Sequence, residues 1–242
     1  MTDDVPLRGK VALVTGGTRG LGRVIAERLA RAGCRVVACH LRDEPAEPLP
    51  DGVTAVRADV TRSDAVVSLV ETVGRRHGRL DFFVHNAVAF HPMSASDLDA
   101  NACARDMAVA LGPFVHGIGP LAGLLAATGG RIVVVSSTGG SAVVPRYVSL
   151  GMAKAALEHL VRYLAVELAP RGVAVNAVAC GKLDEGEPAD AGPNARIVAR
   201  TPLGRLLTRE ELADTVSLLC HPRAGALHGQ VITVDGGLSL LA

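Results

Sequence analysis

Residues 10–22 read KVALVTGGTRGLG, and this stretch decides the fold class. Lys10–Thr15 is a short apolar run rich in strand-forming residues, and four glycines follow within residues 16–22. Arg23–Ala32 has the pattern of a helix, and Gly33 stands where a C-cap glycine is expected. A strand, a glycine turn and a helix in this order are typical of a parallel α/β sheet whose first turn holds a dinucleotide pyrophosphate.

The same alternation continues to the end of the chain. Six further apolar runs predict strands at 35–40, 53–57, 80–85, 131–136, 173–178 and 230–234. Helices are predicted at 63–77, in a long apolar stretch that ends near Thr128, at 147–169 and at 209–220. Strands that are apolar on both faces indicate a parallel sheet covered on both sides. The expected fold class is therefore α/β, a single-domain doubly wound Rossmann fold over residues 1–242 with a seven-stranded parallel sheet.

Two stretches interrupt this pattern. Residues 43–52 hold three prolines and cannot form a helix. Residues 181–207 are predicted to be irregular or to carry short helices, and we expect them to form a substrate lid, because long irregular stretches in compact domains tend to be functional.

Composition excludes several classes of protein. The chain has 242 residues, a net charge of +1 and 49% apolar residues, which argues against a nucleic-acid binder and against disorder. Five cysteines without a CxxC pair predict reduced thiols, no metal site and a cytoplasmic location. Met107–Ala127 is near the length of a membrane span, but it holds two prolines and four glycines. It predicts a buried helix of a soluble protein, at a subunit contact, and no membrane partner.

The charges around the glycine turn bear on the type of cofactor. NAD-binding versions of this turn usually have an acid at the end of the second strand, and here no acid occurs before Asp43. Arg19 lies in the turn and Arg42 just beyond the strand, so two guanidinium groups could hold a 2′-phosphate. This favours NADPH over NADH; the alternative is that both arginines are solvated surface residues.

Further motifs are similar to a known family. Thr15-Gly16-x-x-x-Gly20-x-Gly22, Asp59-Val60, Asn86-Ala87, Ser137, Lys154 and Val234-Asp235-Gly236-Gly237 together resemble the classical short-chain dehydrogenases/reductases, over the whole chain. The resemblance implies that Asp59 and Val60 hold the adenine and that Asn86 lies behind the cofactor. The complete set of expected cofactor contacts is Gly16, Thr18, Arg19, Gly20, Leu21, Gly22, Arg42, Asp59, Val60, Asn86, Ala87, Lys154 and Leu183.

The catalytic positions depart from the common family pattern. Leu150 stands four residues before Lys154, where the family has Tyr, and Val109 stands at the family's Asn. Instead, Tyr147 precedes Lys154 by seven residues, a spacing that resembles the enoyl-acyl-carrier-protein reductase branch. The run from Tyr147 to Val178 is most similar to the NADPH-dependent type III enoyl reductases, although that group has a helix where this chain has its proline-rich stretch.

The spacing also has a physical meaning. Seven residues of helix turn about 700°, which returns to within about 20° of the same face, whereas Tyr163 falls near the opposite face of the helix. In an enoyl thioester, hydride goes to Cβ and the oxygen that gains charge is two carbons away, so a donor about 5 Å further back suits it. We expect Tyr147 to stabilise the enolate oxygen, and Lys154 to hold the ribose and to lower the pKa of the phenol.

The sequence leaves the roles of some residues, and the choice among three functions, open. Ser137 either orients the substrate or caps the turn after the fifth strand, Leu150 forms an apolar wall, and His85 satisfies a backbone group. The first hypothesis is NADPH-dependent reduction of the C=C bond of an α,β-unsaturated acyl thioester or enone, in fatty acid or polyketide biosynthesis. The alternatives are an atypical ketoreductase and a non-catalytic NADPH-binding protein. The acyl substrate is small or held by a carrier protein, and the resemblance implies a homotetramer or homodimer.

Overall fold

The computed structural model describes residues 7–41, 48–186 and 192–241. Seven parallel strands form one sheet, as the sequence predicts, and their order is β3-β2-β1-β4-β5-β6-β7. The strands are β1 (Val11–Thr15), β2 (Arg35–His40), β3 (Val53–Arg57), β4 (Phe82–His85), β5 (Arg131–Ser137), β6 (Ala174–Cys180) and β7 (Val231–Val234). The helices are α1 (Gly20–Arg31), α2 (Ser63–His77), α3 (Ala100–Ala126), α4 (Val148–Leu168), α5 (Gly192–Arg200) and α6 (Arg209–Cys220).

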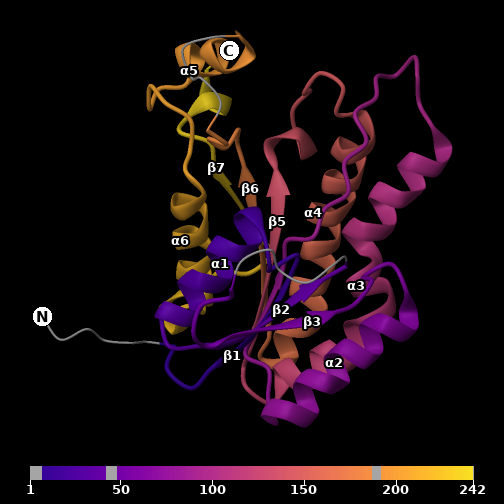
Figure 1. Cartoon of the computed structure of the whole chain (residues 1–242), viewed down its shortest axis with the longest axis vertical. Helices are drawn as coiled ribbons and strands as arrows, with labels where there is room; N and C mark the ends of the chain where they lie inside the picture. Colours follow the sequence, from indigo (N-terminus) through magenta and orange to yellow (C-terminus); the bar gives the residue numbers. More distant parts are fainter. Residues whose placement is uncertain (1–6, 42–47, 187–191, 242) are drawn as a thin grey trace, which may run out of the picture.

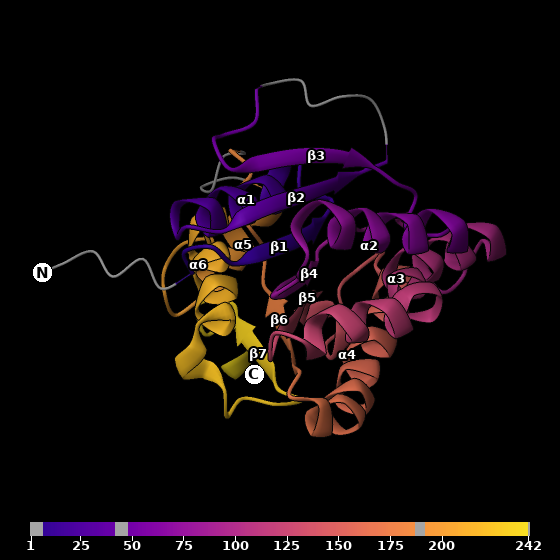
Figure 2. The same cartoon turned by 90° about the horizontal axis from the view of Figure 1, so that it is seen from below.

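Helices cover both faces of the sheet (Figures 1 and 2). Helices α1 and α6 pack together on one face, whereas α2, α3 and α4 lie side by side on the other. Alternate residues of each central strand enter two separate apolar clusters, so that Leu13 and Phe83 face α2–α4 while Val14 and Val84 face α1 and α6. Burial on both faces explains why these strands are almost continuously apolar.

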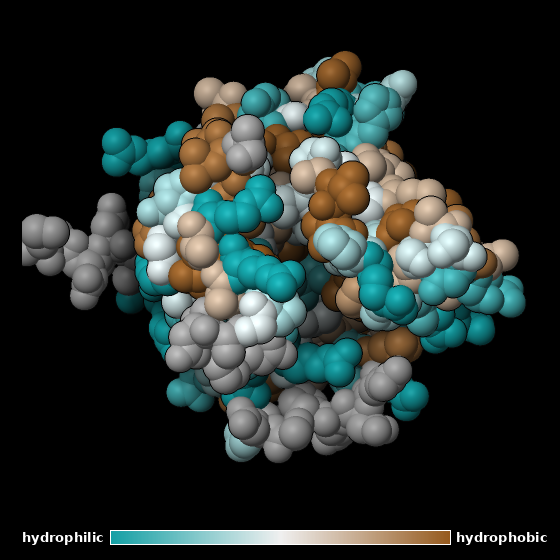
Figure 3. All heavy atoms as spheres, turned by 90° about the horizontal axis from the view of Figure 1, so that it is seen from above, coloured by the Kyte–Doolittle hydropathy of each residue, from teal (hydrophilic) through white to brown (hydrophobic). Residues whose placement is uncertain are grey.

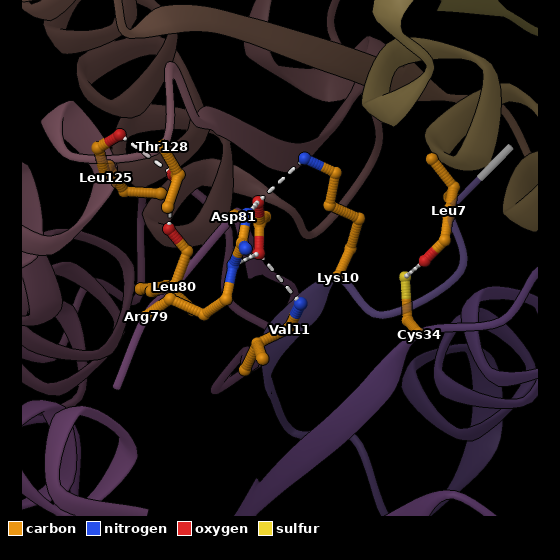
Figure 4. Close-up of polar contacts among 9 residues, drawn as sticks. All are labelled: Leu7, Lys10, Val11, Cys34, Arg79, Leu80, Asp81, Leu125 and Thr128. Atoms are coloured by element: carbon orange, nitrogen blue, oxygen red, sulfur yellow. Dashed lines mark hydrogen bonds and ion pairs between the residues drawn. The ribbon is translucent and has the colours of Figure 1, made fainter. Parts of the chain in front are cut away.

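The amino edge of the sheet is held by one buried carboxylate (Figure 4). Asp81 accepts a hydrogen bond from the backbone N–H of Val11 at 2.9 Å, two from Arg79 at 2.8 and 2.6 Å, and an ion pair from Lys10 at 3.2 Å. Burial tends to raise the pKa of Asp81, but the hydrogen bonds from Arg79 and Val11 and the charge of Lys10 outweigh it and hold that pKa below its usual value. Asp81 therefore joins the start of β1 to the start of β4.

Most predicted bounds agree with the structure, and the differences lie at the ends of elements. Helix α1 begins at Gly20, three residues before the predicted start, because the glycine turn runs directly into the helix. Strand β6 continues to Cys180. Helix α4 begins at Val148, so Tyr147 is its N-cap rather than a helical residue. Residues 42–47 of the proline-rich stretch lie outside the described residues, and the segment 181–207 contains α5.

Helix α3 is long and apolar enough to cross a membrane by length and composition alone. In this structure it lies between α2 and α4, and it buries Leu121, Ala122 and Leu125 in the cluster beneath the sheet. Pro113 and Pro120 are accommodated inside the helix. The arrangement agrees with the prediction of a buried helix.

Two glycines allow a direct test of how the first turn is packed. A Cβ on Gly22 would collide with the backbone carbonyl of Gly16, whereas a Cβ on Gly123 of α3 would meet no heavy atom within 4 Å. We expect Gly22→Ala to lower the free energy of unfolding by about 2 kcal/mol or more, because backbone must move. Gly123→Ala should raise it by up to about 1 kcal/mol, because alanine favours helix. Denaturant unfolding measures both, and equal effects would contradict this description of the turn.

Candidate active site at the carboxyl edge of the sheet

Four central strands end in polar residues at one edge of the sheet. Thr15 of β1 pairs in register with His85 of β4, and Ser137 of β5 pairs in register with Cys180 of β6. This is the end of the molecule shown in Figure 3, where apolar and hydrophilic side chains surround a central recess. In doubly wound folds, ligands bind at this edge.

The turn after β1 has the shape that a dinucleotide needs. The side-chain amide of Asn86 donates to the carbonyls of Thr15 (3.2 Å) and Gly16 (3.3 Å), which fixes the start of the turn. Gly20 has a φ of +51°, and a Cβ there would meet no heavy atom within 4 Å, so open space lies over the turn. No side chain caps α1, and no acid lies in its first turn. The free helix N-terminus beside glycines fits a pyrophosphate group.

Thr15 and His85 lock this turn to β4. The Thr15 hydroxyl accepts hydrogen bonds from the N–H groups of Asn86 (3.0 Å) and Ala87 (3.1 Å) and lies 2.7 Å from Nδ1 of His85. Burial, followed by the charge of Lys154, lowers the pKa of His85 to about 3, so the ring is neutral. With its acceptor sites occupied, the Thr15 hydroxyl donates to Nδ1, which places the ring proton on Nε2. The sequence predicts a backbone partner for His85; the ring interacts with the backbone of Val109 and Ala110 and, in addition, with the Thr15 hydroxyl.

The remaining expected cofactor contacts that the structure describes follow the ends of three strands, β3, β6 and β1. Asp59 accepts hydrogen bonds from the N–H (2.9 Å) and hydroxyl (2.7 Å) of Thr61, and Val60 is buried next to it, beyond the end of β3. Leu183 lies beyond β6 and packs against the cluster that holds Val14. In the turn after β1, Arg19 is exposed, whereas Thr18 and Leu21 are half-buried. Arg42 lies outside the described residues.

Lys154 is buried and placed beneath the strand ends. Its Nζ donates to the carbonyl of Val135 at 2.7 Å, and the side chain is 5% exposed. Burial lowers the pKa of Lys154 to about 8, and the negative charges of Cys180 (when ionised) and Glu158 act in the opposite direction. The ammonium group is therefore charged at neutral pH but close to losing its proton.

Tyr147 is held at the start of α4 by its surroundings. Its ring lies 5.2 Å from the ring of Phe90, and a Cβ on Gly139 would collide with it, so the ring is sandwiched. Its hydroxyl has Ser137 as a hydrogen-bond partner. Its ring lies against Gly139, just after β5, and Lys154 donates to Val135 of β5, so both side chains lie near the carboxyl end of that strand. Tyr163, by contrast, is exposed and pairs with His159.

The expectation for the acidity of this phenol is wrong. Burial raises the pKa of Tyr147, the hydrogen bond from Ser137 lowers it in part, and the charges of Cys180 and Asp106 raise it further. The sequence suggests that Lys154 lowers this pKa, but Lys154 donates to Val135 beneath the strands, and desolvation of the phenol dominates.

Ser137 caps the turn after β5, as one of the two alternatives predicts, whereas its role in orienting the substrate stays a prediction. Its hydroxyl oxygen accepts the N–H of Gly139 at 3.1 Å, and it is also the partner of Tyr147. Leu150 is buried with Ala110 and Ala153 in a small apolar cluster that Tyr147 joins. The position of the usual family Tyr is therefore apolar.

Four polar residues around Tyr147 are not predicted from the sequence. Asp106 is buried in α3 and contacts His91 and Ser149, and Arg146 precedes Tyr147 with a left-handed φ of 58°. One signal was available: Asp106 is the one acidic residue of the 27-residue helix α3, which is mostly apolar.

Comparisons with known proteins agree with this architecture. A family described as enoyl-(acyl carrier protein) reductase matches residues 16–239. A 1-cyclohexenylcarbonyl-CoA reductase of Streptomyces collinus is 41% identical, over 97% of this chain and 89% of its own. A cis-4-hydroxycyclohexanecarboxylate dehydrogenase of Sinomonas cyclohexanicum is 36% identical, over 94% and 96%. A Burkholderia cenocepacia short-chain dehydrogenase solved in complex with NADP superimposes with a TM-score of 0.89 at 31% identity, over 97% and 99%.

The fold and the strand-end site define an oxidoreductase of the kind that uses a nicotinamide dinucleotide. The chain belongs to the short-chain dehydrogenase/reductase family, in its enoyl reductase-like branch.

The burial of Lys154 should cost stability. Its pKa of about 8 lies below the ordinary value of 10.5, so the penalty is complete below pH 8 and disappears as the pH rises toward 10.5. We expect Lys154→Met to raise the free energy of unfolding by about 1–3 kcal/mol at neutral pH while activity is lost. The gain should shrink near pH 10.5. Denaturant unfolding at both pH values checks this, and a destabilised variant at neutral pH would refute it.

Proposed function

We propose that this protein is an NADPH-dependent reductase of the C=C bond of an α,β-unsaturated acyl thioester. The observation that carries the proposal is the position of Tyr147. Its ring lies against Gly139 just after β5, and Lys154 donates to Val135 of the same strand, whereas Leu150 and Val109 leave no phenol or amide at the usual catalytic positions. The relative that reduces a cyclic enoyl-CoA supports the same reaction.

The chain supplies placement and charge stabilisation. When bound, the dinucleotide supplies the hydride that adds to Cβ of the substrate. Tyr147 donates a hydrogen bond to the thioester oxygen as negative charge develops there, and a proton must then reach Cα. Because burial raises the pKa of Tyr147, the phenol stays protonated at neutral pH and remains a donor. The charged Lys154 stabilises negative charge at this edge, and it is the residue that would hold the ribose hydroxyls.

The surroundings of the site favour an apolar acyl group. Leu150, Ala110 and Ala153 form an apolar wall beside Tyr147, with Met107 packed against it. Exposed apolar side chains follow the ends of β4 and β5, namely Val88, Phe90 and Val144, and Leu203 is exposed beyond α5, where its N–H donates to the carbonyl of Gly236 after β7. An alicyclic or short aliphatic enoyl group suits these contacts. Coenzyme A and a carrier protein both fit as the thiol carrier.

A second candidate function has a specific observation in its favour. The Sinomonas relative is a dehydrogenase of a cyclic alcohol, and the site could instead reduce one particular ketone. In that reaction the oxygen is bonded to the carbon that takes the hydride, so it would lie closer to Leu150 than to Tyr147. A protein that binds the dinucleotide without turnover is the third possibility.

Tyr147→Phe tests the proposed role. With 1-cyclohexenylcarbonyl-CoA or crotonyl-CoA and NADPH, we expect kcat to fall by about a hundredfold or more, because the donor to the enolate oxygen is lost. Tyr163→Phe is the matched control and should retain full activity. Product analysis should show a saturated thioester. Unchanged turnover in Tyr147→Phe would reject the role of the phenol, and an alcohol with the double bond intact would favour ketone reduction.

The preference for NADPH is tested separately. Arg19 is exposed in the turn after β1, where it would contact a 2′-phosphate. We expect Arg19→Ala to raise KM for NADPH by about tenfold and to change KM for NADH little, because one charge-assisted hydrogen bond is lost. Arg28→Ala, which removes a surface ion pair with Asp214, is the control. Steady-state kinetics with both cofactors provides the measurement, and an equal effect on both would contradict the assignment.

The assembly and location stay proposals as well. Val115 of α3 and Val166 and Tyr163 of α4 are exposed large side chains on neighbouring helices, which supports subunit packing through these two helices. We therefore propose a homotetramer or homodimer in the cytoplasm. The role of residues 181–207 as a substrate lid is part of the same proposal.

A further inference from the structure

The backbone of Tyr147 lacks some of the hydrogen bonds that hold a residue inside a helix. As the N-cap of α4, with φ −116° and ψ 13°, it is not fixed by the helix on both sides. A general acid or donor must nevertheless be held closely in place, because small displacements cost rate. Other parts of the chain must therefore hold the residue.

We propose that Asp106 is a positioning residue for Tyr147, whose buried carboxylate ties the loop 88–99 to the first turn of α4. This inference deepens the function proposed above and rests on Tyr147 acting as the donor to the substrate oxygen. Asp106 itself does not touch the substrate.

The contacts of Asp106 run to both elements that flank the phenol. Its Oδ1 lies 2.7 Å from Nδ1 of His91, and its Oδ2 accepts hydrogen bonds from the Ser149 hydroxyl at 2.7 Å and the N–H of His91 at 3.4 Å. His91 follows Phe90, whose ring lies against Tyr147, and Ser149 comes two residues after Tyr147 in α4. One carboxylate thus connects both neighbours of the phenol.

Burial makes this connection strong. Asp106 is 1% exposed and Ser149 is completely buried, so water does not compete for these hydrogen bonds. A buried carboxylate in an apolar helix is costly unless its oxygens are satisfied. The free-energy cost of burying this carboxylate is offset by its hydrogen bonds, and the residues that make them flank Tyr147.

The loop 88–99 is also attached to Arg146, the residue directly before Tyr147 and outside α4. The N–H of Met93 donates to the carbonyl of Arg146 at 3.1 Å, and the Arg146 guanidinium donates to the carbonyl of Pro92 at 3.1 Å. The left-handed backbone of Arg146, a conformation that costs about 1 kcal/mol in residues other than glycine, directs the chain into this contact. In Figure 1 the loop between β4 and α3 passes beside the start of α4.

The carboxylate also reaches Tyr147 through its charge. The groups around the phenol are Ser137 at the end of β5, Cys180 at the end of β6, Asp106 on α3 and His91 in the loop 88–99, and Lys154 on α4 interacts with Cys180. Among them, Asp106 acts to raise the pKa of Tyr147. A change at Asp106 should therefore be visible in the titration of Tyr147.

The composition of the chain makes that titration direct. There is no tryptophan, and Tyr147 and Tyr163 are the only tyrosines. In a Tyr163→Phe background, the near-ultraviolet absorbance of tyrosinate reports Tyr147 alone. We expect Asp106→Asn to lower the pKa of the phenol, because a negative charge is removed while the shape is kept. Asp81→Asn, which removes a buried carboxylate at the opposite edge of the sheet, is the matched control and should leave it unchanged.

Kinetics then test positioning itself. Ser149→Ala cuts the tie to α4 without changing any charge, and we expect kcat to fall by about tenfold with KM changed less than about threefold. Ser149→Thr keeps a hydroxyl and should restore most of kcat. This readout depends on turnover, whereas the titration needs neither cofactor nor substrate.

The outcomes separate this inference from the proposed function. A phenol pKa that is the same in Asp106→Asn and the parent, or that falls equally in Asp81→Asn, overturns the link between Asp106 and Tyr147. Full kcat in Ser149→Ala overturns the positioning role, and this variant decides the question if Asp106→Asn does not fold. If enoyl thioesters are not reduced by the parent protein but the titration behaves as expected, the proposed reaction fails while the link remains.

Discussion

Parallel strand pairing is the constraint on which this structure depends. Each strand must start again at the amino edge, so every connection crosses the sheet and all carboxyl ends gather at one edge. Thr15, His85, Ser137 and Cys180 lie far apart in the sequence, yet the register places them as two pairs in adjacent strands. Asp81 secures the opposite edge by joining the starts of β1 and β4. The polar groups of the site are therefore brought together by the register of the parallel strands rather than by any single loop.

Burial determines how the groups at this edge behave. His85 loses its capacity for charge, and Lys154 keeps its charge at a lowered pKa of about 8. The phenol of Tyr147 moves in the opposite direction and is held as a neutral donor. A neutral donor beside a buried cation suits a reaction in which negative charge appears on a substrate oxygen only briefly. Because Tyr147 precedes α4, its phenol takes a different position from that of a tyrosine inside the helix, but its backbone is not held by helical hydrogen bonds on both sides. Contacts from the loop 88–99 hold the residue instead.

Much of the fold could be predicted because it depends on local patterns. The bounds of β2, β3, α2 and α6 agree with the structure to the residue, since each is an apolar run or a periodic stretch with clear ends. The start of α1 was missed because glycines disfavour helices on average, and packing against the turn overrides that tendency. At the site, the spacing predicts that Tyr147 and Lys154 act together; this stays a prediction, because Tyr147 is the N-cap of α4 rather than a helical residue. The partners of Tyr147 could not be predicted, because the contacts of Asp106 with His91 and Ser149 join three elements through side chains.

The interlocked Thr15, His85 and Asn86 have a consequence for ligand association. Their hydrogen bonds bridge β1, β4 and the glycine turn in the free protein, so this part of the edge is already ordered before anything binds. A ligand that binds to a rigid surface loses its own translational and rotational freedom, but the protein loses little further conformational entropy. Association at this half of the edge should therefore carry a small entropic penalty, and selectivity there should come from shape rather than from induced adjustment.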